Sequence, residues 1–205
     1  MSIEKVRAYF RALDTREGTG DSSGTGDVQT QGGRFATGDA QARDGLSSKN
    51  AVQTGQGLEG RILEFPVSSA TVELAAQALG VEPARIAKSL SFKIDDKPLL
   101  IVAAGDARID NPAYKARFHA KAKMLSHEEA HTFIGHDVGG VCPFALPPDV
   151  PVYLDESLRR FSTVYPAAGS GSSAIELTCG ELERYASNFS GWVDVCKGWR
   201  GEGAC

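Results

Sequence analysis

The stretch from Asp14 to Gly57 constrains the fold of this chain more than any other feature of its sequence. Ten of its 44 residues are glycine and only four are large and apolar, while short polar side chains make up most of the rest. Ordering such a segment would cost more conformational entropy than its burial could offset. We therefore expect residues 14–57 to be a flexible insertion that can be deleted, and residues 1–13 with 58–199 to form a single domain.

Composition and charge narrow the class of protein. No apolar run approaches the roughly 20 residues that span a bilayer, and the first residues lack the pattern of a secretory signal. We therefore expect a cytoplasmic protein with no membrane partner. The four cysteines form no CxxC pair and are expected to be reduced thiols. The formal net charge of -4 argues against bulk attraction to a polyanion, so any nucleic-acid contact must come from a local basic cluster.

Hydrophobic periodicity and end signals predict both helices and strands outside the insertion. Helices are expected at 3–13, 72–79, 111–118, 126–135 and from 178 onward. Strands are expected at 61–67, 88–94, 99–104, 152–154, 162–165 and 174–177. Ser68–Ser69 is expected to cap the second helix. Because strands and helices do not alternate strictly, we favour an α+β fold with a substantially antiparallel or mixed sheet over a doubly wound one.

Lys88 is the first candidate functional residue. In a strand over 88–94, its side chain shares a face with the apolar residues Leu90, Phe92 and Ile94. A buried ammonium needs a carboxylate or an anionic ligand beside it. A lysine at the start of a strand can instead extend to water along its aliphatic stem. The pattern leaves both interpretations open.

Two loops rich in small residues could bind a ligand through their backbone. The loop Gly139–Pro143 can present main-chain N–H groups as an oxyanion hole, although a structural turn is the commoner use of a Gly-Gly pair. Residues 167–173 are small enough to let a ligand approach the main chain. Cys142 lies in the first loop, and the sequence reveals no base for a nucleophilic thiol. We therefore expect Cys142 to line a pocket.

One motif points to metal chemistry that its setting does not support. His127, Glu128 and His131 match the H-E-x-x-H pattern of zinc peptidases. The serine before them is a helix cap, and the carboxylates suit the first turn of a helix. Ile134 and Asp137 stand where the extended zinc-protease pattern needs glycine and histidine. We expect no metal, and a zinc peptidase is kept as a remote alternative.

A locally basic stretch stands out in this acidic chain. No acidic residue occurs between 111 and 127, where four lysine or arginine side chains are concentrated. The stretch could follow a phosphate backbone, or it could be a solvated helix face. Its members are Lys115, Arg117, Lys121 and Lys123.

Three blocks taken together resemble the YbaK-type aminoacyl-tRNA deacylases, which are relatives of the editing domain inserted in bacterial prolyl-tRNA synthetases. The blocks are Ala87–Phe92, Gly135–Phe144, and Val164–Gly169 leading to Ala174–Leu177. Their order and spacing fit, and the resemblance covers 58–197 with the first helix. It implies an α+β fold whose mixed sheet is partly barrel-like and flanked by helices. It also implies a hydrolase for the ester of a mischarged tRNA, tRNA-Pro or a related tRNA carrying a small amino acid.

The resemblance also implies roles for individual residues. Lys88 would bind the phosphate or ribose end of the tRNA. The catalytic loop would comprise Gly139, Gly140, Val141, Cys142 and Pro143, whose amides would stabilise the developing oxyanion. Substrate-binding positions would be Phe65, Ser69, Gly169 and Ser170. The partners implied are the acceptor end of an aminoacyl-tRNA and, as a second candidate, a synthetase. We expect a monomer that needs no cofactor.

The sequence departs from the family pattern at one chemically important place. Some members carry an aspartate before the Ile-Glu-Leu triplet, where this chain has Ala174. We therefore expect water to attack with help from the substrate's own groups and the Gly139–Pro143 loop. A binding module that has lost hydrolysis is the alternative. The sequence does not decide between alanine, cysteine, serine, 2-aminobutyrate and proline as the amino acid removed, because the pocket would separate them by about a methylene.

Overall fold

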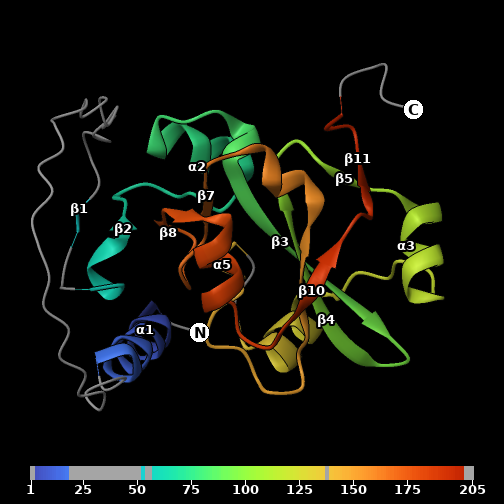
Figure 1. Ribbon diagram of the computed structural model, residues 1–205, viewed down its shortest axis with the longest axis horizontal. Helices are drawn as coiled ribbons and strands as arrows, with labels where there is room; N and C mark the ends of the chain where they lie inside the picture. The colour runs from blue at the N-terminus through green and yellow to red at the C-terminus, as the bar shows by residue number, and fades with distance from the viewer. Residues whose placement is uncertain (1–2, 19–51, 54–56, 137–138, 201–205) are drawn as a thin grey trace, which may run out of the picture.

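The computed structural model describes residues 3–18, 52–53, 57–136 and 139–200 (Figure 1). Most of the expected insertion and the pair Asp137–Val138 lie outside these residues. The first helix, α1, spans Ile3–Gly18, so it ends beyond Leu13, where we expected the insertion to begin. Asp14 belongs to the folded part, because its Oδ2 accepts a hydrogen bond from the Leu58 backbone N–H at 3.0 Å. No helix among the described residues is long and apolar enough to cross a membrane.

A six-stranded mixed sheet forms the centre of the molecule, in the order β10-β6-β4-β3-β7-β9. Neighbours β3–β4 and β7–β9 are antiparallel, whereas β3–β7, β4–β6 and β6–β10 are parallel. The strands are β3 Ile86–Ile94, β4 Lys97–Ala104, β6 Val152–Asp155, β7 Thr163–Pro166, β9 Leu177–Thr178 and β10 Phe189–Val193. The mixed sheet confirms the expected α+β class.

Two smaller sheets complete the strand arrangement. The sheet β1-β2-β8 adjoins β7 through an isolated bridge between Ala167 and Ala174, so the strands curl into a partial barrel. The other pair is β11-β5. Their bounds are β1 Val52–Gln53, β2 Ile62–Glu64, β5 Arg108–Ile109, β8 Ser173–Ile175 and β11 Cys196–Lys197.

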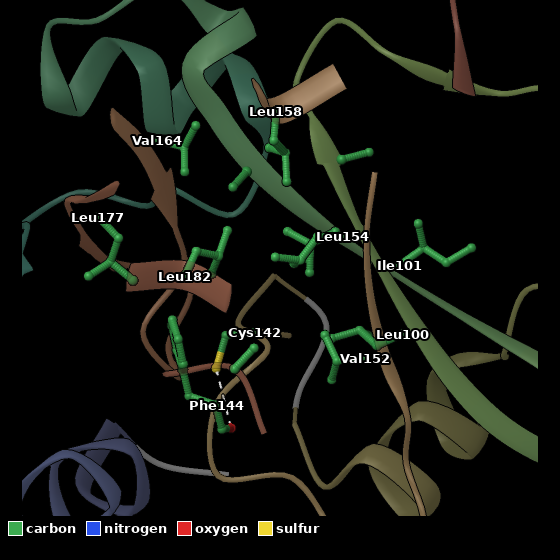
Figure 2. Packing of buried hydrophobic residues seen from close by; sticks show 14 of the residues in the cluster. Leu100, Ile101, Cys142, Phe144, Val152, Leu154, Leu158, Val164, Leu177 and Leu182 are labelled. Atoms are coloured by element: carbon green, nitrogen blue, oxygen red, sulfur yellow. Dashed lines mark hydrogen bonds between the residues drawn. The ribbon is translucent and has the colours of Figure 1, made fainter. Parts of the chain in front are cut away.

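The hairpin β3–β4 supplies the middle of the sheet, as the sequence predicts. Asp95 and Asp96 join the strands with φ angles of 46° and 62°, and two consecutive positive φ values characterise the type I′ turn that matches strand twist. Every residue of β4 after Lys97 is buried. Figure 2 shows buried side chains that β4, β6, β7, β9 and α5 contribute to the main core, among them Leu100, Leu154 and Leu182.

Short helices and helical turns surround the sheet. The helices are α2 Val72–Leu79, α3 Asn111–Phe118, α4 His127–Glu129 and α5 Cys179–Tyr185, and the turns are η1 Glu59–Arg61, η2 Pro83–Arg85, η3 Ala130–Ile134 and η4 Glu156–Arg160. Capping boxes form at Ser126 and Thr178, as expected. The cap of α2 is Thr71 rather than Ser68–Ser69, because the Thr71 hydroxyl accepts from the Leu74 N–H at 3.2 Å.

Helix α1 packs against the segment that contains Phe144 and against the end of α5. Val6 and Phe10 are fully buried, and the Phe10 ring lies 4.9 Å from the ring of Phe144, centroid to centroid. The Tyr9 hydroxyl donates to the Tyr185 carbonyl at 3.0 Å, which ties α1 to the end of α5. The N-terminal helix therefore supports the segment just after Pro143.

Candidate functional site

A cavity of about 260 Å³ opens between β3, the start of α2 and the loops that contain Gly139 and Ala167. Its wall includes side chains or backbone of the loop before α2, of β3, of the segment before α4, of residues 139 and 141, and of β7 and β8. Much of this wall is alanine, serine and glycine, which leaves a small space with few large side chains. The cavity is small beside the roughly 300–1,000 Å³ of common ligand pockets.

The structure brings four of the predicted site residues together in the cavity wall. These residues are Ser69, Lys88, Gly139 and Val141. Ala174, the departure from the family pattern, also lies in the wall and is buried. No aspartate or glutamate belongs to the wall as far as the described residues show it. The titratable side chains of that wall are those of Lys88, His127 and Tyr165.

The Lys88 ammonium is held by main-chain oxygens rather than by a carboxylate. It donates to the carbonyl of Gly105 at 3.0 Å and to that of Ala107. Burial lowers the pKa of Lys88, and the negative charge of Asp106 acts in the opposite direction. No ion pair joins Lys88 to a carboxylate within the described part of the chain. Since an ammonium has three N–H donors, one donor is left for a ligand.

Three loops interlock at the edge of the cavity. Gly139 has a φ of +88°, and a Cβ there would lie only 2.7 Å from the Cβ of Ala70. A Cβ on Gly140 would lie 3.0 Å from the Cα of Ser170. The Ser69 N–H donates to the Gly171 carbonyl at 2.6 Å. The glycines are therefore needed for close contact between loops, and Gly140 and Ser170 are not part of the cavity wall.

Cys142 does not line the cavity, contrary to our expectation. It is fully buried in the main core, and its thiol donates to the Phe144 carbonyl at 3.8 Å, as Figure 2 shows. Its Sγ also lies 3.7 Å from Nε2 of His136. Burial raises the pKa of Cys142 to about 12, so the group is a neutral thiol near pH 7. Cys142 and Phe144 both belong to the main core cluster and neither lies in the cavity wall.

Pro143, Phe65 and Gly169 also lie outside the cavity wall. Pro143 is buried, and its carbonyl accepts from the Ser187 N–H at 2.8 Å. Phe65 packs in a second core cluster whose other members include Tyr165 and Ala174 of the wall, so it supports the pocket from behind. Gly169 has a φ of +92° and packs against α1. These three residues therefore lie around the site rather than in its wall.

The basic stretch lies on the surface and leads to the cavity. Its four side chains, Lys115, Arg117, Lys121 and Lys123, are all exposed. The chain then passes beside β3, where the Lys93 N–H donates to the Lys123 carbonyl at 2.9 Å. Met124, which follows directly, is 57% exposed and forms part of the cavity wall. The stretch is therefore an exposed, positively charged segment that ends next to a residue of the cavity wall.

The H-E-x-x-H segment does not have the geometry of a zinc peptidase. Regular α-helix covers only His127–Glu129 and is followed by the π-type turn η3. Glu129 is paired with Lys93, which lowers the pKa of that carboxyl through a hydrogen bond. Within the described ranges, no group of three or more histidine, cysteine, aspartate or glutamate side chains could hold a metal ion.

Tyr165 and Ser89 are two of the wall residues that the sequence did not indicate. Tyr165 is mostly buried, and its hydroxyl donates to Oε1 of Glu176 at 2.9 Å. Ser89 follows Lys88, and its buried hydroxyl has no hydrogen-bond partner within the described residues. Both residues look like ordinary strand positions in the sequence. Only the packing of β3 and β7 around the cavity distinguishes them.

Comparison with known proteins places these features in a family. The model of the aminoacyl-tRNA editing domain matches residues 67–185. Protein YwhH of Bacillus subtilis (strain 168) is 55% identical over 142 residues, 69% of this chain and 90% of that protein. A proposed Cys-tRNA(Pro)/Cys-tRNA(Cys) deacylase of Enterococcus faecalis is 30% identical over 110 residues, 52% of this chain and 66% of that protein.

A solved structure and a class of larger enzymes show the same relationship. The structure is that of a proposed trans-editing enzyme for prolyl tRNA synthetase, with a TM-score of 0.61 and 29% identity over 67% of this chain and 86% of that one. The chain also matches proline–tRNA ligases, and it covers 20% of the one from Bacillus velezensis. Since the family model matches more than half of its residues, the chain belongs to the aminoacyl-tRNA editing domain family.

Proposed function

We propose that this protein is a free-standing deacylase that hydrolyses the ester of a mischarged tRNA carrying a small amino acid. The observation that carries the proposal is the cavity of about 260 Å³ that joins Lys88 to Gly139 in a chain of the editing family. The names of two relatives, which refer to prolyl-tRNA synthetase and to Cys-tRNA(Pro), support tRNA-Pro as the carrier. A synthetase that presents the tRNA is the proposed second partner.

The size of the cavity favours a small aminoacyl group. Ala87, Ala130, Ala167 and Ala174 contribute to its wall, and a Cβ on Gly139 would already collide with Ala70. A bulky aminoacyl side chain would require these closely packed segments to move apart, which close-packed interiors resist. A small aminoacyl group needs no such movement.

The proposed reaction is attack of water on the ester carbonyl carbon. The carbonyl oxygen takes up the electron pair and becomes an oxyanion, which main-chain N–H groups of the Gly139–Pro143 loop would stabilise. The oxyanion then re-forms the carbonyl as the bond between the carbonyl carbon and the ribose oxygen breaks, and the ribose oxygen takes up the proton that the attacking water loses. The products are the free amino acid and a tRNA with its terminal hydroxyl restored. In this scheme Lys88 uses its remaining donor to hold the phosphate or ribose of the terminal nucleotide.

The basic stretch is the proposed contact for the tRNA backbone. Its exposed lysines and arginine are free of ion pairs with carboxylates among the described residues, so they can neutralise phosphates. Met124 lies where this stretch reaches the cavity. The terminal nucleotides of the acceptor end would therefore run along 115–123 and enter the cavity beside Met124.

A panel of mischarged tRNAs tests the proposal. The purified protein should release at least one small amino acid, from tRNA-Pro or a related tRNA, faster than spontaneous hydrolysis does. Bound but intact aminoacyl-tRNA after prolonged incubation would favour the second candidate, a binding module. That candidate rests on Ala174, which brings no carboxylate to the wall at the place where some relatives have one. If the protein neither binds nor deacylates any tRNA of the panel, both candidate functions are rejected.

A further inference from the structure

A turn directly after β4 holds the Lys88 ammonium through its main chain. The turn closes where the Ala107 N–H donates to the Ala104 carbonyl at 3.0 Å. Lys88 donates to the carbonyls of Gly105 and Ala107, which flank the middle residue of this turn. The conformation of the turn therefore sets the direction in which the ammonium points its remaining donor.

Asp106, the residue between these two carbonyls, is bound by Arg160. Nη2 of Arg160 donates to one oxygen of the carboxylate at 2.6 Å, and Nη1 donates to the other at 3.1 Å. Two parallel bonds of this kind fix the relative orientation of a guanidinium and a carboxylate. Bidentate geometry is also the case in which a partly exposed ion pair contributes to structure. The pair therefore restrains the turn at its middle residue.

Arg160 is itself anchored to two other segments. Its Nε donates to the Ser157 carbonyl of η4 at 2.9 Å, and its Nη1 donates to the Trp199 carbonyl at 3.0 Å. The guanidinium carbon also lies 4.8 Å from the ring centroid of Phe161 and 5.2 Å from that of Trp199. Cation–π contacts at such distances are attractive. Arg160 therefore ties the turn after β4 to η4 and to the segment after β11.

Asp106 acts on Lys88 through its charge and not through a direct bond. Its carboxylate raises the pKa of Lys88, against the lowering that burial causes, although no ion pair joins these two described residues. Arg160 binds both oxygens of the same carboxylate. The third donor of Lys88 is therefore not taken up by the nearest acid and stays available for a ligand.

We propose that Arg160 is a positioning residue for Lys88: by binding Asp106 it fixes the turn whose carbonyls orient the ammonium toward the substrate. This inference rests on the proposed function, in which Lys88 holds the phosphate or ribose of the terminal nucleotide. Arg160 lies outside the cavity wall, so it acts on the site through the turn. The machinery that prepares Lys88 thus extends from β3 to η4 and the segment after β11.

The NMR signal of the Lys88 ammonium tests the proposal without requiring turnover. In isotope-labelled protein, an ammonium held by hydrogen bonds exchanges its protons with water more slowly than an exposed one, and Lys88→Ala identifies the signal by removing it. Wild-type protein should show a protected Lys88 ammonium. Arg160→Gln and Asp106→Ala each break the ion pair, so both should raise the exchange rate by about threefold to tenfold, the range for one weakened hydrogen bond.

Arg61→Gln is the matched control for the loss of an ion pair. The Arg61 guanidinium also donates to a carboxylate, that of Glu181, at 2.6 Å, and to a main-chain carbonyl at 2.6 Å. It lies outside the cavity wall and is not bonded to the turn after β4. Arg61→Gln should lower Tm about as much as Arg160→Gln does and leave the exchange of the Lys88 ammonium unchanged.

Deacylation rates of the same variants separate positioning from a general structural effect. The substrate is the mischarged tRNA that the wild-type protein cleaves fastest. Arg160→Gln should lose about threefold to tenfold of kcat/KM when Lys88 is present, and less than about twofold when Lys88→Ala is present as well. A merely structural role would lower kcat/KM by the same factor in both backgrounds.

Several outcomes would overturn the proposal. They are a wild-type Lys88 ammonium that exchanges as fast as exposed lysines, an unchanged exchange rate in Arg160→Gln, a change in Arg160→Gln that Asp106→Ala does not reproduce, and an equal loss of kcat/KM in both backgrounds. Absence of hydrolysis on the tRNA panel would instead reject the deacylase, while the ammonium signal would still decide whether Arg160 positions Lys88.

Discussion

At the scale of single residues, burial decides what two chemically attractive side chains can do. Cys142 lies in the loop that resembles a catalytic motif, yet its thiol is fully buried and its pKa is raised to about 12. Lys88 is only partly buried, and two carbonyl oxygens accept hydrogen bonds from its ammonium and leave one donor available. The lysine therefore remains chemically useful at the site, whereas the cysteine contributes to the core.

Replacing Cys142 by alanine tests this distinction. The variant should keep kcat/KM for deacylation within about twofold, because no step uses the thiol. It should lose about 1–2 kcal/mol of unfolding free energy, because a filled core position is emptied. Denaturant unfolding and a deacylation assay measure the two effects. A loss of activity of tenfold or more, at unchanged stability, would return Cys142 to the catalytic group.

At the scale of elements, the site depends on contact between loops rather than on one motif. Gly139 touches the loop before α2, Gly140 touches the loop at 169–173, and the Ser69 N–H joins these two loops at Gly171. Gly139 has both a positive φ and a close neighbour, so any side chain there would strain the backbone and push Ala70 away. The loops hold the cavity open through this arrangement.

Gly139→Ala should damage the site, and Gly180→Ala is its matched control. A Cβ on Gly180, in α5, meets nothing within 4 Å, and alanine favours helix, so this variant should be at least as stable as the wild type. Gly139→Ala should lose about 1–3 kcal/mol of stability and about tenfold or more in kcat/KM. Wild-type rates in Gly139→Ala would show that the loop contact does not shape the site.

Elements with strong local signals were predictable from the sequence, and those that depend on distant partners were not. The β3–β4 hairpin, α2, α3 and the two capping boxes have their periodicity and end signals within a few residues. Strand β10 contains a serine and Gly191 and forms because it pairs in parallel with β6, nearly forty positions earlier in the chain. The end of α1 was missed because Asp14 is held by a contact with Leu58.

At the scale of the whole molecule, an ion pair connects the start of the sheet strand β2 to helix α5. The Arg61 guanidinium, which directly precedes β2, donates to Oε1 of Glu181 in α5 and to the Glu176 carbonyl, both at 2.6 Å. The hydrogen bond from Arg61 lowers the pKa of Glu181 to about 2 from its ordinary 4.5. The pair therefore stabilises the arrangement of β2, β9 and α5 only while the carboxyl is ionised.

Acid unfolding tests this link. A carboxyl whose pKa is lower in the folded state adds stability that is fully present above pH 4.5 and is lost as the pH falls toward about 2. Glu181→Gln keeps an acceptor for the Thr178 cap and removes the charge. Its Tm should lie below that of the wild type at pH 6, and the two should converge toward pH 2. Parallel Tm curves over this range would show that the ion pair contributes nothing.

The candidate site was predictable where a motif carries the information. The resemblance placed Lys88 and Gly139 in one site, and the cavity joins both. The resemblance did not reveal that Cys142 points into the core, because the direction of a loop side chain depends on what packs behind it. Ser89 was not predictable, since an unpartnered hydroxyl can be recognised only when its surroundings are known.

The deacylation rate of Lys88→Ala tests the central claim most directly. The assay follows the mischarged tRNA that the wild-type protein cleaves fastest, with Tm measured to confirm that the variant is folded. The account predicts that the wild type accelerates hydrolysis and that Lys88→Ala loses about tenfold or more of that rate, because the terminal nucleotide loses its cationic contact. A folded variant that retains activity within about twofold of the wild type would contradict the account.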